Sequence, residues 1–404
     1  MKPCFLKADM LLPRDDETAR LWPVVACDQF TSQKGYWQEL EALVGDEPSS
    51  LNIVFPEVYL DEGEDRIRRI QGYIEDYLAR GILSQRVTDG FVLVERRTAS
   101  GLRPGIVGKV DLDCYDYSPE SKSLVRATEG TVTSRIPPRV KIREGAALES
   151  PHIMLLADDK EGELVQSLYS RRDSLPLLYD LELMMGGGHL RGWAVTGEEA
   201  ERVQQIILAQ QAKAELYLAV GDGNHSLATA KTCWERIKPQ LTEIERESHP
   251  ARYALAELQD LHCPALRFEP IHRLLENVDA EALIAAFTAA VPCAEGEDVV
   301  FMWKDMRRGF RFTQAGDRLP VDLLQRFLDS YLAEHGGVSI DYVHGDDTVE
   351  QLGRRPGCCG IALKGMDKDS LFPAIRAGGV LPRKTFSMGD AQEKRYYMEC
   401  RKIR

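Results

Sequence analysis

A short run of residues near the middle of the chain has the types and spacing that phosphate chemistry needs. It consists of Gly221, Asp222, Gly223, Asn224, His225 and Ser226. The apolar residues 215–220 before it predict a buried strand, and residues 227–234 after it contain good helix formers. A strand, a glycine turn and a helix start direct backbone N–H groups and the positive end of the helix at one place. That arrangement binds anions, most often phosphate.

Two side chains of this turn could take part in a reaction. Asp222 could bind a metal ion or orient a hydroxyl, and His225 could act as an acid, a base or a donor to phosphate. The alternative is a purely structural turn, in which Asp and Asn cap the helix and glycine supplies a positive φ. The spacing alone favours neither interpretation.

A second candidate is the basic segment 122–143, which contains six basic residues and a single acidic residue, Glu129. Guanidinium groups such as those of Arg126 and Arg139 bind phosphate or carboxylate through paired hydrogen bonds. Glu129, alone among cations, is suited to act as a general base or a metal ligand. The alternative is a solvated loop, which the prolines at 137 and 138 favour.

Two later segments complete the candidates. In 268–273, His272 and Arg273 follow a proline and could reach a ligand, although a single histidine near an apolar run is more often structural. In 381–390, Lys384 and Thr385 supply a cation and a hydroxyl. We expect this C-terminal stretch to fold back over a site rather than fray.

Composition narrows the classes of function. A net charge of −13 argues against a general nucleic-acid binder, which needs a basic surface. An apolar run long enough for a membrane span and a signal peptide are both missing from the sequence. Nine cysteines without paired spacing indicate free thiols and a cytoplasmic location, with Cys358 and Cys359 packed in a strand. A phosphate-binding loop ending in Gly-Lys-Ser, a Gly-x-Gly-x-x-Gly fingerprint and zinc-ligand spacing do not occur.

The elements around the candidates alternate between helix and strand, which predicts a mixed α/β fold. Helices are expected at 64–80, ended by Gly81, and at 196–213, with a capping box from Thr196 and Glu199. Strands 91–97 and 106–112 should form a hairpin. Residues 184–189 read as a loop. After residue 278 we expect helices at 279–290, 321–334 and 369–376, and strands at 299–303, 310–312, 338–343 and 361–363. The predicted parts are 1–278, which contains the turn, and 279–404, which packs back on the first.

Four elements, taken in order, resemble a bacterial and archaeal family known as domain of unknown function ten-fifteen. Its Asp-Gly-His-His-Arg-like turn matches 222–226, and its Arg-x-x-Glu-x-Thr element matches Arg126, Glu129 and Thr131. Its Pro-x-His-Arg element matches Pro270, His272 and Arg273. Its Pro-x-Lys-Thr/Ser-x-Phe-like element matches Pro382, Lys384, Thr385 and Phe386. The similarity covers nearly the whole chain, and the order of the elements is more specific than any one of them.

The turn also looks like that of the ParB and sulfiredoxin superfamily, which includes nucleotide-binding partition proteins and a free-serine kinase. The resemblance implies a ParB/sulfiredoxin-like core in which the turn and the helix start hold nucleotide phosphates. Ser226 stands where many relatives have arginine, so phosphate binding would depend on backbone N–H groups and on Arg126 or Lys384.

Together these observations predict a protein that binds a nucleotide or another small phosphorylated ligand and transfers a phosphoryl group to a small metabolite, using Mg²⁺ and ATP or ADP. The alternative is a ParB-like nucleotide or effector sensor without turnover. A membrane or nucleic-acid partner is not expected. The expected catalytic residues are Asp222, His225 and Glu129. The expected phosphate-binding residues are Gly221, Gly223, Asn224, Ser226, Arg126, Thr131, Arg139, His272, Arg273, Lys384 and Thr385.

Overall fold

The computed structural model describes residues 2–316 and 318–404, and its chain divides into two compact units. Unit 1 comprises Met1–Ala127, Thr131–Leu266 and Gly389–Arg404; unit 2 comprises Thr128–Gly130 and Arg267–Met388. The sequence placed one boundary near residue 278. The structure divides the chain earlier because the strand Phe268–Glu276 pairs within the sheet of unit 2, and it returns the last residues to unit 1.

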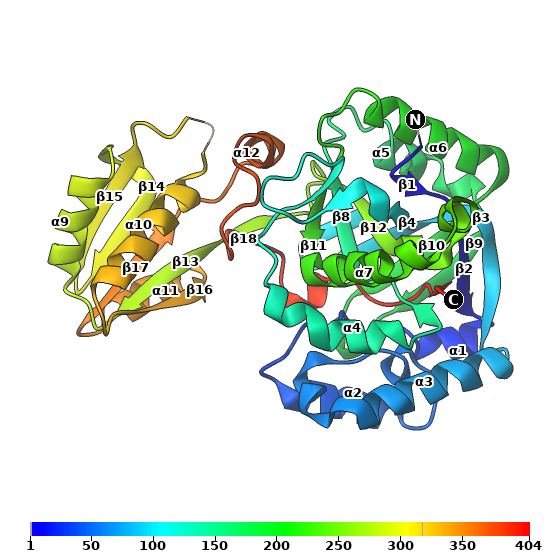
Figure 1. Ribbon diagram of the computed structural model, residues 1–404. Coiled ribbons are helices and arrows are strands. Elements are labelled where there is room, and N and C mark those ends of the chain that lie inside the picture. Colours follow the sequence, from blue (N-terminus) through cyan, green and yellow to red (C-terminus); the bar gives the residue numbers. More distant parts are fainter. Residues whose placement is uncertain (1, 317) are drawn as a thin grey trace. The chain divides into compact units, whose positions relative to one another are not determined.

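Unit 1 contains an 11-stranded sheet of mixed direction (Figure 1). Its main path runs β5-β6-β11-β8-β12-β4-β3-β10-β9, with β1 paired to β4 and β2 to β3. The strands of unit 1 are β1 Phe5–Leu6, β2 Ala8–Pro13, β3 Leu83–Thr98, β4 Gly101–Asp111, β5 Tyr115–Asp116, β6 Val125–Ala127, β7 Leu148–Glu149, β8 Ile153–Ala157, β9 Leu177–Glu182, β10 His189–Val195, β11 Leu218–Asp222, β12 Tyr253–Asp260 and β19 Arg401–Lys402, of which β7 and β19 pair separately. Its α-helices are α1 Asp16–Arg20, α2 Lys34–Val44, α3 Gly63–Ala79, α4 Ile136–Glu144, α5 Val165–Ser170, α6 Gly197–Gln211, α7 Asn224–Ile237 and α8 Glu243–Ser248.

Apolar side chains occupy both faces of the large sheet. Because successive side chains of a strand point to opposite faces, a single strand contributes to two cores. On β3, Val92 and Val94 belong to the core shared with α2 and α3, whereas Phe91 and Leu93 belong to the core shared with α5, α6 and α7. Figure 1 shows α2 and α3 on one side of this sheet and α5 and α6 on the other. Helix α4 packs on α7 through Ile136 and Ala228.

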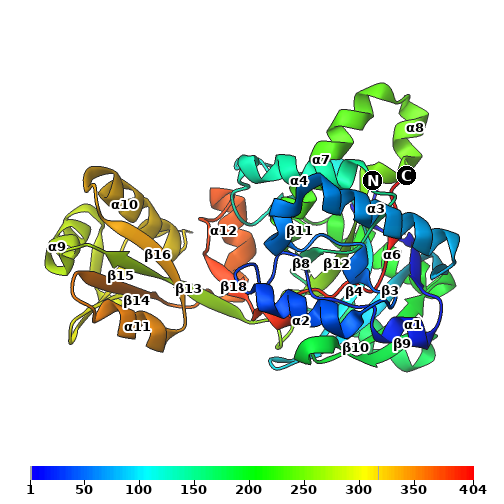
Figure 2. The ribbon, with the colours of Figure 1, turned by 90° about the horizontal axis from the view of Figure 1, so that it is seen from below.

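Unit 2 contains a six-stranded antiparallel sheet in the order β15-β14-β17-β13-β16, with β18 paired to β13. Phe301 of β14 stacks toward Phe287 of α9, while Val300 and Met302 pack with Val349 of α11, so helices cover both faces. The strands are β13 Phe268–Glu276, β14 Cys293–Trp303, β15 Met306–Phe312, β16 Ser339–His344, β17 Cys358–Leu363 and β18 Phe386–Met388; the helices are α9 Ala280–Ala290, α10 Pro320–Glu334, α11 Asp346–Gly353 and α12 Leu371–Gly378. Figure 2 shows the same elements from below.

The mixed α/β fold is confirmed, as are the hairpin β3–β4, the helix α3 before Gly81 and the helices α9 and α10. Cys359 is a buried strand residue, as predicted. The capping box at Thr196 is wrong, because α6 begins there without a side-chain cap. The segment 122–143 is not a loop throughout, since the buried strand β6 and the helix α4 occupy much of it. Among the described residues, the helices are too short or too polar to cross a bilayer.

Candidate functional site

The predicted turn lies in unit 1, where β11 meets α7. Gly221 sits in a register shift between β11 and β8, so it is a bulge residue of the strand rather than part of the turn. Gly223 alone makes the turn: its φ is 78° and it precedes the first residue of α7. A Cβ at Gly223 would lie 3.0 Å from Cδ2 of His152 and from Cα of Ile153, so glycine is required by both backbone and space.

The helix start carries the predicted anion-binding groups. Asn224, His225 and Ser226 are the first three residues of α7, and the first bond of the helix runs from the N–H of Leu227 to the carbonyl of Gly223, 3.0 Å away. The amides of these three residues therefore lie at the positive end of the helix. Nε2 of His225 lies 3.3 Å from the N–H of Val132 and accepts its hydrogen bond.

Asp222 is paired with a lysine from the C-terminal segment. Oδ2 of Asp222 lies 3.3 Å from Nζ of Lys394, and its Oδ1 accepts the N–H of Gly223 at 2.9 Å. Lys394 therefore brings to the turn the cation that Arg126 or Lys384 was expected to supply. The C-terminal residues 389–404 belong to unit 1, whereas most of the stretch 381–390 belongs to unit 2.

A second polar group lies against the same turn. Nδ1 of His152 is 2.6 Å from the hydroxyl oxygen of Tyr397, and Nε2 of His152 is 3.3 Å from Oδ2 of Asp28. The hydroxyl oxygen of Tyr397 also accepts the N–H of Cys27 at 2.9 Å. We call Asp28, His152 and Tyr397 the His152 group.

Electrostatics favour the charged forms of Asp28 and His152. Burial alone would raise the pKa of Asp28, but His152 opposite it and Lys394 nearby hold that pKa well below its usual value. Burial alone would lower the pKa of His152, but Tyr397 and the Asp28 carboxylate raise it well above its usual value. Burial raises the pKa of Tyr397. The Asp28 carboxylate and the His152 imidazole thus each favour the charged form of the other.

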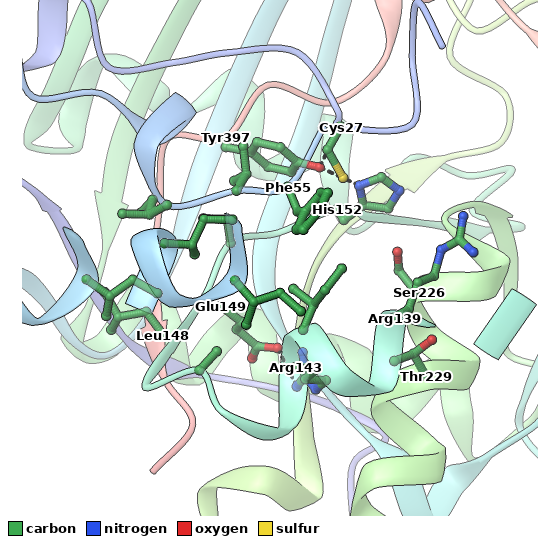
Figure 3. A pocket seen from close by; sticks show the side chains of 18 of the residues that line it. Cys27, Phe55, Arg139, Arg143, Leu148, Glu149, His152, Ser226, Thr229 and Tyr397 are labelled. Carbon is green, nitrogen blue, oxygen red and sulfur yellow. Dashed lines mark hydrogen bonds and ion pairs between the residues drawn. The ribbon is translucent and has the colours of Figure 1, made fainter. Parts of the chain in front are cut away.

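A cavity of about 180 Å³ opens beside both features (Figure 3). His152, Tyr397 and Cys27 line one part of it, and Ser226 and Thr229 of α7 line another. Most of its remaining lining is aliphatic, from the segment 53–60 and the helices α3 and α4. Ser226 thus belongs both to the helix start and to the cavity wall.

Arg139 also lines this cavity, but its guanidinium forms an ion pair with Glu57. It was expected to bind phosphate. The nearby Arg143 pairs with the carboxylate of Glu149 at 2.7 Å. Both arginines of α4 therefore have acidic partners within the protein.

Arg126 and Thr131, also expected to bind phosphate, lie in unit 1. Arg126 is 2% exposed, and its guanidinium donates to the carbonyls of Ser123 at 2.8 Å and Glu215 at 3.0 Å. These bonds join the chain before β6 to the chain before β11, which is a structural role. The buried hydroxyl of Thr131 has no hydrogen-bond partner among the described residues.

The five other expected residues, Glu129, His272, Arg273, Lys384 and Thr385, lie in unit 2. Nδ1 of His272 accepts the N–H of Leu363 at 3.1 Å, and burial lowers the pKa of His272. Arg273 donates to Gln325 at 2.9 Å and to the carbonyl of Lys384 at 3.1 Å, and burial lowers its pKa to about 10.

Two more of these residues contact neighbours in unit 2. The hydroxyl of Thr385 donates to the carbonyl of Pro382 at 2.6 Å, and Glu129 forms a bridge with Leu381. The side chains of His272, Arg273 and Thr385 thus bond to groups of their own unit.

The comparison with solved structures finds only distant likenesses. A variant of free serine kinase in complex with ADP aligns with a TM-score of 0.40 and 9% identity, covering 73% of this chain and 91% of that chain. SbnI from Staphylococcus aureus, with a C-terminal truncation, aligns with a TM-score of 0.37 and 8% identity, covering 70% and 82%. A conserved hypothetical protein from Pyrococcus furiosus aligns with a TM-score of 0.35 and 9% identity, covering 72% and 90%. These values are too low to transfer a ligand or a reaction to this chain.

The sequence matches no curated protein. A family model does match the sequence, over residues 12–331, which is most of the chain. The matched range includes the turn, Asp28 and His152, whereas Tyr397 lies beyond it. The chain belongs to the family described as "Protein of unknown function (DUF1015)".

Proposed function

We propose that unit 1 binds the phosphates of a nucleotide, ATP or ADP, at the start of α7. The observation that carries the proposal is that Ser226, the third residue of this helix, lines a cavity together with His152, while Asp222, just before the helix, pairs with Lys394. Backbone N–H groups at a helix start and a nearby lysine are the usual partners of phosphate. Gly223 lets the helix start pack closely on His152 and Ile153, because a Cβ there would lie 3.0 Å from both.

The proposed reaction is phosphoryl transfer to a small metabolite that carries a hydroxyl. The hydroxyl oxygen forms a bond to the terminal phosphorus, the bond from that phosphorus to the leaving nucleotide breaks, and the hydroxyl proton passes to the Asp28 carboxylate. An ionised aspartate fills this role in protein kinases, where catalysis is mostly positioning and charge stabilisation. His152 holds Asp28 in place through its Nε2, 3.3 Å away, and Lys394 offsets charge on the phosphates.

Mg²⁺ is part of the proposal because phosphoryl transfer needs neutralising charge. In proteins this ion takes one or two carboxylates and fills its remaining positions with phosphate and water oxygens. Asp222 and Asp28 are the carboxylates of the site, and each already faces a cation, Lys394 or His152. This donor set fits an ion that arrives with the nucleotide better than one held by the protein alone.

The second candidate is a nucleotide or effector sensor on a ParB/sulfiredoxin-like core. It is favoured by Ser226, which replaces the arginine expected at the turn and so leaves one cation fewer for catalysis. Turnover of a nucleotide with a metabolite pool separates the candidates, since only the enzyme releases a phosphorylated product.

The proposal is tested by titrating the full chain calorimetrically with ATP, ADP and GTP, with and without Mg²⁺. We expect saturable binding that weakens about tenfold in Lys394→Met, because one charge-assisted bond to phosphate is lost. The matched control is Lys141→Met, since Lys141 is 69% exposed and pairs loosely with Glu64 at 3.8 Å. An absence of heat at millimolar nucleotide would overturn the proposal.

A further inference from the structure

We infer that the cavity of unit 1 binds a neutral, apolar group of about the size of a benzene ring, and that this group is the body of the phosphoryl acceptor. The second half of this inference rests on the proposed function. The first half rests on the cavity alone, and the two can fail separately.

The walls of the cavity are hydrocarbon over most of their surface. The isoleucines Ile67, Ile70 and Ile74 project from α3, Ile142 from α4, and Phe55 from the segment before α3. Walls of this kind offer few hydrogen-bond partners, so a polar group placed there would lose its bonds to water without replacement. A sugar or a charged amino acid is therefore a poor occupant.

The charges that line the cavity are already neutralised. Arg139 pairs with Glu57, and Arg143 pairs with Glu149. Glu149 also accepts from Nε of Arg401 at 2.7 Å. Burial alone would raise the pKa of Glu149, but Arg401 and Arg143 lower it, so the carboxylate stays ionised between its two partners. An ionic ligand would have to break one of these pairs, whereas a neutral one would not.

Besides the paired charges, the polar lining includes Gln71 and Ser150, and a second polar group at the edge that adjoins the helix start. His152, Ser226 and Thr229 form this second group (Figure 3). The hydroxyl of Thr229 is used within the helix, donating to the carbonyl of His225 at 2.7 Å. A ligand with an apolar body and one hydroxyl would thus place the hydroxyl toward His152 and Ser226, next to the proposed phosphate position.

The volume of the cavity indicates the size of the group that it can enclose. The cavity measures about 180 Å³. A dry apolar cavity of about 150 Å³ in another protein binds benzene. A phenyl ring or a branched chain of similar volume fits this space, whereas a purine that uses its polar edges does not find partners in it. The acceptor class is therefore a small aromatic or branched aliphatic alcohol.

The test measures binding of four neutral alcohols or polyols to the full chain by ligand-observed NMR: benzyl alcohol, 3-methylbutan-1-ol, glycerol and erythritol. We expect benzyl alcohol and 3-methylbutan-1-ol to bind at least tenfold more tightly than glycerol or erythritol. Equal or tighter binding of glycerol or erythritol would overturn the inference. This comparison needs no variant.

A variant that fills the cavity tests whether the alcohols bind there. Ala146 lines it, so Ala146→Leu should weaken benzyl alcohol at least tenfold and leave ATP binding within about twofold. The control is Ala285→Leu on the exposed face of α9 in unit 2. If Ala146→Leu does not fold, Ile142→Phe fills the same space. Unchanged alcohol binding in a folded filling variant would overturn the inference.

The outcomes separate the two proposals. If ATP binds but the apolar alcohols do not, the inference about the acceptor fails and the proposed function stands. If the alcohols bind in the cavity and ATP does not bind, the cavity site stands and the proposed function fails.

Discussion

Two adjacent cations of the C-terminal segment, Lys394 and Arg395, lie in contrasting environments. Arg395 is 1% exposed, and it pairs with Glu257 and Glu399, which are equally buried. Lys394 is 11% exposed and pairs with Asp222, whose side chain is 25% exposed. Neighbouring side chains of an extended segment point in opposite directions, so the same segment contributes one cation to each of the two clusters. The buried cluster around Arg395 can therefore only stabilise the fold. The partly exposed cluster around Asp222 can also contact a ligand.

The most direct test of this contrast is to replace Arg395 and Lys394 one at a time and to compare the losses of stability. Arg395→Met removes the guanidinium that pairs with the buried carboxylates of Glu257 and Glu399 and leaves them with neutral hydrogen-bond partners such as Gln259 and Tyr179, so we expect a loss of about 3–5 kcal/mol in the free energy of unfolding. Lys394→Met should cost less than about 1 kcal/mol, because Asp222 keeps contact with water. Urea unfolding followed by circular dichroism measures both. Equal losses would show that the two clusters do not differ as described.

The next prediction concerns the His152 group. Asp28→Asn should lower the rate of phosphoryl transfer by about 10²–10⁴-fold, because it removes the proposed proton acceptor. Nucleotide affinity should change by less than about threefold. Single-turnover kinetics and calorimetry give the two values. A variant that keeps full activity would remove Asp28 from the mechanism.

A smaller effect is expected at the turn. Gly223→Ala combines a positive φ with a Cβ 3.0 Å from His152, so we expect a loss of about 1–3 kcal/mol in stability and weaker nucleotide binding. Gly81→Ala is the control, since Gly81 has a φ of 64° but open space around it. It should cost about 1 kcal/mol, from strain alone. Thermal unfolding of both variants measures the difference, and equal costs would argue against close contact of Gly223 with His152.

The smallest effect is a dependence on pH. Because the pKa of His152 is raised in the folded state, its contribution to stability is complete below about pH 6.5 and is lost as the pH rises through the folded value. Because the pKa of Asp28 is lowered, its contribution is present above about pH 3.9 and is lost only as the pH falls through the folded value. The stability gap between the wild-type chain and His152→Gln should therefore be largest near pH 5–6 and shrink toward alkaline pH.

His272 supplies the contrast for that measurement. Burial lowers its pKa, so its contribution should be lost as the pH falls, the opposite direction from His152. Urea unfolding of His152→Gln and His272→Gln across pH 5–9.5 checks both. Parallel profiles for the two variants would contradict the assigned directions.

Much of the fold could be predicted from local pattern. The helices α3, α9 and α10 have regular apolar spacing, and the hairpin β3–β4 has alternation and a glycine turn. The capping box at Thr196 was wrong because the right residue types were present without the side-chain bond. The boundary near residue 278 missed β13, whose partners β16, β17 and β18 come much later in the chain.

The site was only partly predictable for the same reason. The turn 221–226 is local, so its residue types indicate a helix start. His152 and Tyr397 are 245 positions apart, and no spacing rule connects them. Lys394 was in view as part of a basic tail, but its pairing with Asp222 follows from the path of the last residues back into unit 1. Charge alone does not tell a ligand-binding arginine from a structural one: Arg126 donates to the carbonyls of Ser123 and Glu215, and Arg273 donates to Gln325. The convergence of Arg126, Arg273 and Lys384 on the turn stays a prediction.

The measurement that tests the central claim most directly is an amide NMR spectrum of the isotope-labelled full chain during titration with ADP. We predict that the largest shifts fall on the backbone N–H groups of Asn224, His225 and Ser226 and that Lys394→Met reduces them. If a saturating nucleotide leaves these amides unchanged, or shifts only residues of unit 2, the start of α7 is not the phosphate site.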